Sequence, residues 1–485
     1  MGIPATRAIH ESMKIALSRN IAQYSRVINL VAFASITTSP LWLAALFFTN
    51  PRDYSYISSL ICVPLLAVVG AVVIAHLTQG DSYLRRLLMT SLIAHMFASS
   101  LFLWVGIAIY GGVADAFHYW TIGLDLANMF PIVGWSAFQP PYWSSNLIFN
   151  LCGLAALLVG DALPTLFIAS SFISLAGGYL FYRAFVIAFP DGDRWLCGLL
   201  LLLMPSILFW SSFIGKDALI QFFIALTCLG FAELTQRSSL RGIVYCAIGL
   251  IGTMMVRAHV AAMLAIALTF PYTVGKSRIG GTNKAVKIIL IPALCAGTLF
   301  FLTQAQNFLN ANIDSDNSSV HSGRSTSAVG EANNVTKNSQ FGGSAFNQGT
   351  ALSMRIAESP FLLFRPFPWE MHTPMALAAA FESAGLMYLC WKRRHAIGLT
   401  LRQWRNPYVG FLVMYCVIFT ITFGGAISNF GILLRQRIMM TPVVLMLICA
   451  KQIPLARTAS RQSREDAWLA SYAARLRADR MAAGD

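Results

Sequence analysis

Apolar segments long enough to cross a lipid bilayer recur along almost the whole of this 485-residue chain. A helix needs about 20 apolar residues to cross about 30 Å of hydrocarbon. Because peptide groups find no water inside a bilayer, each crossing segment must satisfy its own hydrogen bonds, as a helix does. The sequence therefore predicts an all-α fold, a polytopic transmembrane helical bundle. We place about twelve spans, at 27–48, 57–77, 89–111, 163–183, 195–213, 217–235, 241–256, 258–274, 285–303, 374–391, 408–426 and 434–450.

The composition excludes a soluble fold and argues against a nucleic-acid partner. The chain is 56% hydrophobic and 11% charged, whereas soluble domains are about 25% charged. Its net charge of +15 comes from short basic clusters between apolar segments, not from one basic patch or stripe. We interpret these clusters as topology signals, and expect membrane lipids to surround the protein.

The distribution of lysine and arginine predicts the orientation. The apolar stretch 144–160 is short for a span, and we expect it to lie at the surface. With a cytoplasmic N-terminus, 26 of the 35 basic residues then face the cytoplasm, including those of 276–287, 392–405 and the C-terminal tail. This asymmetry follows the positive-inside rule. If 144–160 crossed, the basic clusters that follow it would lie outside.

The same assignment divides the chain into five parts. The two largest outward segments are 112–162, which suits surface helices, and 304–373, whose Ser/Asn/Gly-rich sequence is typical of a linker or lid. We expect an N-terminal segment with two accessory helices (1–88), a transmembrane core (89–303) that includes 112–162, the outward loop (304–373), C-terminal transmembrane helices (374–453) and a cytoplasmic amphipathic tail (454–485).

Charged residues cluster at five outward-facing span ends. Isolated arginines at such positions commonly anchor a helix at the interface, but charges partly withdrawn from water usually pair or bind a ligand. We therefore expect these clusters to form one site. They are Asp115 with His118 and Tyr119, Lys216 with Asp217, Arg257 with His259, Arg365 with Glu370, and Arg435 with Arg437.

The order of these features resembles the GT-C superfamily of membrane glycosyltransferases. In that superfamily an early outward loop carries an acidic residue and contains surface helices, here GGVADAFHYW and the segment 125–160. Later helices end in tyrosine with basic residues, here LAGGYLFYR, and in proline with small polar residues and an outward acid, here LLMPSILFWSSFIGKDAL. The resemblance covers about 89–275. It departs from the family in having a single Asp115 followed by alanine, and two spans before the core.

The resemblance implies a transferase that takes a sugar from a polyprenyl-phosphate donor and passes it to a glycan, lipid or protein acceptor. Taken together with the lysine and arginine distribution, it leads us to expect an enzyme of a bacterial inner membrane, with both termini cytoplasmic and the site facing the periplasm. Asp115 would be the catalytic base. The single acid leaves a divalent metal cofactor open. Phosphate would be bound by Arg257, Arg365, Arg435, Arg437 and Lys216, and the site would be lined by His118, Tyr119, Asp217, His259 and Glu370.

Three other functions remain open from the residues. A polysaccharide polymerase or ligase of the O-antigen type would also use lipid-linked sugars and outward arginines. A lipid-linked sugar flippase or other transporter would carry ionisable residues inside its spans, where Glu382 is the main example. A structural membrane subunit would need neither site nor path.

The predicted orientation can be tested with reporter fusions. A periplasm-active reporter fused at residue 330 should be active, and the same reporter fused within 276–287 or 392–405 should be inactive, because the basic clusters hold those loops in the cytoplasm. Cytoplasmic behaviour of the fusion at residue 330 would contradict the assignment.

Overall fold

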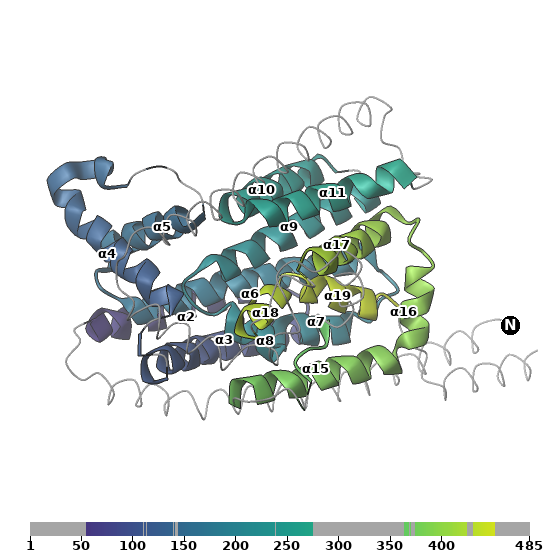
Figure 1. The fold of residues 1–485 in the computed structure, drawn as a ribbon, viewed down its shortest axis with the longest axis horizontal. Helices are drawn as coiled ribbons and strands as arrows, with labels where there is room; N and C mark the ends of the chain where they lie inside the picture. Colours follow the sequence, from purple (N-terminus) through teal and green to yellow (C-terminus); the bar gives the residue numbers. More distant parts are fainter. Residues whose placement is uncertain are drawn as a thin grey trace, which may run out of the picture.

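The computed structural model describes residues 55–274, apart from 110, 113, 139, 141–143 and 238, and residues 363–367, 369, 374–423 and 430–451. All regular secondary structure in this part is helical (Figure 1). The predicted spans 27–48 and 285–303 and the tail 454–485 lie outside the described residues. The helices are α2 (Ser55–Leu77), α3 (Ser82–Ala108), α4 (Asp115–Val133), η1 (Gly134–Ala137), α5 (Ser144–Val159), α6 (Leu163–Ala188), α7 (Arg194–Leu203), α8 (Pro205–Trp210), α9 (Lys216–Arg237), α10 (Leu240–Val256), α11 (Ala258–Val274), α15 (Pro374–Lys392), α16 (Arg394–Leu401), α17 (Pro407–Phe423), α18 (Phe430–Arg437) and α19 (Thr441–Cys449).

Three of the described helices, α3, α6 and α9, are long and apolar enough to cross a membrane. The described residues thus contain three candidate spans, and the predicted total of about twelve spans is not confirmed. Apolar side chains also cover the exposed face of α2, including Ile61, Leu65, Val68 and Val72. The all-helical structure of the described residues, with long apolar helices and an exposed apolar helix face, suits a membrane environment.

Two segments that we predicted as single spans are each broken into two helices. In 195–213, α7 ends before Met204, whose backbone is extended, and α8 begins at Pro205. Proline lacks an N–H and disfavours a helical conformation in the residue before it, so the break follows from the sequence. In 434–450, residues 438–440 separate α18 from α19.

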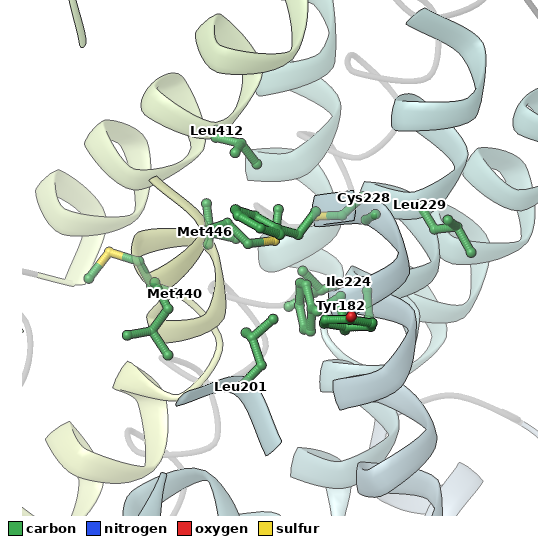
Figure 2. Close-up of a cluster of buried hydrophobic side chains, with 14 of the residues drawn as sticks. Tyr182, Leu201, Ile224, Cys228, Leu229, Leu412, Met440 and Met446 are labelled. Atoms are coloured by element: carbon green, nitrogen blue, oxygen red, sulfur yellow. The ribbon is translucent and has the colours of Figure 1, made fainter. Parts of the chain in front are cut away.

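One buried cluster joins the N-terminal and C-terminal halves of the described chain. Figure 2 shows Tyr182 of α6, Leu201 of α7 and Cys228 of α9 facing Leu412 of α17 and Met446 of α19. Burying a large apolar side chain contributes about 1.5–3 kcal/mol in water, but in lipid close packing takes over that role. This packing fixes α19, and α18, which precedes it, lies in contact with α8.

The α4 and α5 helices form a hairpin on the left of Figure 1. They follow the C-terminal end of α3 and precede the N-terminal end of α6, so they lie at the same end of the bundle as the start of α9. The segment expected at the surface, 144–160, is α5. At the opposite end Arg393 pairs with Asp193 at 2.9 Å, next to α16.

Gly123 allows α4 to lie against α5. A Cβ atom at this position would lie 2.9 Å from the backbone nitrogen of Gly153 and would also meet Cys152. Real Cβ atoms do not approach backbone that closely, so a side chain here would push the two helices apart.

We expect Gly123→Ala to lower the free energy of unfolding by about 1–2 kcal/mol, because the overlap outweighs the better helix propensity of alanine. Gly385→Ala in α15 is the matched control, since its Cβ would enter open space and should be neutral or stabilising by up to about 1 kcal/mol. Thermal unfolding of the two variants in detergent compares them. Equal Tm values would contradict the packing of α4 on α5.

Candidate active site

The buried carboxylate of Asp217 binds two arginines from distant parts of the chain. It lies in the first turn of α9 and is 1% exposed. Its Oδ1 accepts a hydrogen bond from Nη2 of Arg257 at 3.0 Å, and its Oδ2 accepts one from Nε of Arg435 at 2.5 Å. The positive charges of these two guanidinium groups, each hydrogen-bonded to one carboxylate oxygen, offset the cost of burying the carboxylate. Asp217 thereby ties the α10–α11 junction and α18 to the start of α9.

Arg435 also reaches a second, exposed carboxylate. Its Nη1 donates to Oδ2 of Asp115 at 2.6 Å. The Asp115 side chain is 58% exposed, whereas that of Arg435 is 19% exposed. The guanidinium carbon of Arg435 lies 5.4 Å from the ring centroid of Phe213, which favours a charged, planar group at this position. Arg435 therefore links the exposed start of α4 to the buried start of α9.

Lys216 lies beside these pairs, and among the described residues no carboxylate lies within salt-bridge distance of it. Its Nζ donates to Oγ of Ser144, the first residue of α5, at 3.1 Å. Electrostatic interactions connect it to Arg257, Arg435 and both aspartates. We call Asp115, Lys216, Asp217, Arg257 and Arg435 the aspartate–arginine cluster. It carries three positive and two negative formal charges, so it offers an anion an excess of positive charge.

Of three other predicted site residues, Tyr119 and His259 interact with members of the cluster, whereas the described ring contact of His118 is with Phe149. Tyr119 hydrogen-bonds Ser145 and interacts with Asp115. Its burial, and then the Asp115 carboxylate, raise the pKa of the Tyr119 phenol above its ordinary value of 10, so it stays protonated at neutral pH. His259 interacts with Arg257 and Lys216, and His118 is exposed and packs its edge on Phe149.

Arg437 has an anchoring environment in place of the phosphate-binding role expected from the sequence. It is 1% exposed, and its Nη1 donates to the carbonyls of Leu363 and Arg365 and to Oγ of Ser383. Its Nη2 lies 3.4 Å from Glu382. Because α18 advances about 100° per residue, Arg435 and Arg437 point to different partners. Arg437 fixes α18 so that Arg435 can reach the two aspartates.

Arg365 and Glu370 are not placed in the cluster. The half-buried Arg365 supplies its backbone carbonyl to Arg437 and Ser383, and Glu370 lies outside the described residues. Glu382, the main ionisable residue that the sequence places inside a span, accepts a hydrogen bond from the backbone N–H of Ser206 at 2.6 Å. It connects α15 to the break between α7 and α8.

Gln436 is a site residue that the sequence prediction missed. Its Oε1 accepts a hydrogen bond from Nη1 of Arg257, which orients that guanidinium toward Asp217. The signal was present in the triplet Arg435-Gln436-Arg437. Successive residues of a helix point in different directions. Because Arg435 and Arg437 have partners on opposite sides of α18, Gln436 points to a third side of this helix.

The described residues do not fit a divalent metal site. Within this part of the chain, no three His, Cys, Asp or Glu side chains gather as a metal-binding group. The two aspartates of the cluster are bound to arginines, which compete with a metal ion for their oxygens. No protein-family model, curated protein or solved structure matches this chain.

The two aspartates should respond differently to removal of their charge. Asp217→Asn leaves two nearly buried guanidiniums short of a counter-charge and should destabilise the protein by about 3–5 kcal/mol. Asp115→Asn breaks a half-exposed pair and should cost at most about 1 kcal/mol. Tm values of the two purified variants in detergent provide the comparison. A Tm for Asp217→Asn as high as that of the unmodified protein would show that the buried carboxylate does not hold the site together.

Proposed function

We propose that this protein is a membrane glycosyltransferase that moves a sugar from a polyprenyl-phosphate donor to an acceptor hydroxyl on the periplasmic face of a bacterial inner membrane. The main support is a half-exposed carboxylate, Asp115, in contact with a cationic cluster at one end of an apolar helical bundle. The function would serve the assembly of cell-envelope polysaccharides or glycoconjugates. The resemblance to the GT-C superfamily suggested the same chemistry from sequence alone.

The reaction needs a base and a cationic phosphate site at short range. As the acceptor oxygen bonds to the anomeric carbon, the bond from that carbon to the phosphate oxygen breaks, and its electron pair leaves with the phosphate. Asp115 takes the acceptor proton. Arg435 and Lys216 bind the departing phosphate, whose negative charge grows in the transition state. Arg257 holds Asp217 and thereby keeps Arg435 in position.

The position of the cluster suits a lipid-linked donor. It lies where α9 begins and where α10 and α11 meet, so a phosphate bound there would leave its isoprenoid chain beside apolar helices. On α10 the exposed side chains of Val244, Ile248 and Ile251 form an apolar helix face. A water-soluble nucleotide sugar has no lipid chain that could pack on these apolar helices.

Transport of a lipid-linked sugar is the second candidate, because polar side chains also lie buried among the helices. His95 of α3 approaches Oγ of Ser174 on α6 at 3.3 Å, and Ser174 approaches Oε1 of Gln221 on α9, also at 3.3 Å. All three residues are at most 2% exposed. Buried polar groups in spans mark transport paths in many membrane proteins, and this group lies one helical turn from Asp217 along α9.

We expect Asp115→Asn to lower kcat for glycosyl transfer by about 100-fold or more, because the amide has the shape of the carboxylate without its basicity. Lys216→Met should mainly raise KM for the donor, since the lost contact acts in the ground state too. The assay offers purified protein a panel of polyprenyl-phosphate-linked hexoses and pentoses with glycan acceptors.

The outcomes separate the candidates. Product formed at full rate by Asp115→Asn would remove this residue from the chemistry. Movement of the lipid-linked sugar across proteoliposomes, without any glycosyl product and abolished by His95→Ala, would support transport and contradict transfer.

A further inference from the structure

The two carboxylates that share Arg435 are held very differently. Asp217 is 1% exposed and also binds Arg257, whereas Asp115 is 58% exposed and its described ion pair is with Arg435 alone. An anion that displaced the Asp217 carboxylate from its arginines would break two ion pairs and leave one arginine without a counter-charge. An anion that displaced the Asp115 carboxylate from Arg435 would break one contact and return that carboxylate to water, which costs little. Asp115 is therefore the ligand of Arg435 that a competing anion can displace.

The cluster favours such an exchange electrostatically. With both aspartates in place it holds one excess positive charge, and among the described residues the hydrogen-bond partner of Lys216 is a serine hydroxyl. An incoming phosphate would find a cation in Lys216 and a second one, Arg435, after Asp115 leaves. Phosphate offers more acceptor oxygens than a carboxylate and suits a guanidinium fork.

We infer that Asp115 holds the place of the donor phosphate on Arg435: its carboxylate pairs with Arg435 until the phosphate binds there and displaces it. This inference rests on the proposed function and extends it. The displacement also releases the Asp115 carboxylate from its ion pair at the moment when an acceptor proton has to be taken. Binding of the lipid phosphate and activation of the base are then one event, which disfavours reaction before the donor has bound.

The exchange predicts an unusual donor affinity for the Asp115→Asn variant. Mutation of a residue that acts only in catalysis leaves donor affinity unchanged, and mutation of a residue that binds the donor lowers it. Mutation of a carboxylate that competes with the donor phosphate raises donor affinity, because Arg435 is then free to bind the phosphate. The expected gain in affinity is about two- to five-fold, the range that corresponds to a half-exposed ion pair.

The experiment titrates farnesyl phosphate into the purified full-length protein in detergent and measures Kd by calorimetry. Asp125→Asn is the matched control, because Asp125 is an exposed residue of the same helix α4, about 15 Å along its axis from Asp115. It changes the net charge equally and leaves the Asp115–Arg435 pair intact. We expect Asp115→Asn to bind farnesyl phosphate about two- to five-fold more tightly than both the unmodified protein and Asp125→Asn.

A second measurement follows the carboxylate itself. Saturating farnesyl phosphate should increase the modification of Asp115 by a carbodiimide and an amine, measured by mass spectrometry, and leave that of Asp125 unchanged. Equal or weaker binding by Asp115→Asn, an equal gain in Asp125→Asn, or no binding by any form would overturn the exchange. Because neither measurement uses glycosyl transfer, a failed exchange leaves the transferase proposal to its own assay, and a failed transferase assay leaves the exchange standing.

Discussion

The buried carboxylate of Asp217 is the contact on which the organisation of the site depends. It joins the start of α9 to Arg257 and to Arg435, which lie 40 and 218 residues away along the chain. A buried charge is tolerated only when paired, so the three side chains stabilise one another's positions. The exposed Asp115 then completes a chain of alternating charges that runs from the interior to the surface.

A second buried ion pair fixes the position of these alternating charges. Arg437 binds Glu382 and the carbonyls of residues 363 and 365, and so attaches the short helix α18 to α15. Breaks between helices make these contacts possible. Because α7 and α8 are separate helices, the backbone N–H of Ser206 is free to donate to Glu382. Because α18 and α19 are also separate, α18, which carries Arg435 and Arg437, can take a direction different from that of α19.

The sequence predicted the parts of this arrangement that depend on local chemistry. Hydropathy placed both ends of α9 within two residues of its observed bounds, whereas α3 begins seven residues before its predicted span and α6 ends five residues after its own. The chain order put Asp115, Lys216, Asp217, Arg257 and Arg435 at ends of apolar segments. Pairing was beyond its reach, because a partner 320 residues away, as for Asp115 and Arg435, leaves no local signal. Hydropathy also averaged over the breaks at Met204 and at 438–440, and could not tell that Arg437 faces away from the cluster. The transferase function and the membrane orientation stay predictions.

A cryo-electron microscopy map of the protein with a bound prenyl phosphate would show directly whether the aspartate–arginine cluster is a phosphate site with Asp115 at its mouth. We expect phosphate density within hydrogen-bonding distance of Arg435 and Lys216, with Asp217 still bound to both arginines and Asp115 turned away from Arg435. Phosphate density among His95, Ser174 and Gln221, with the Asp115–Arg435 pair intact, would contradict it.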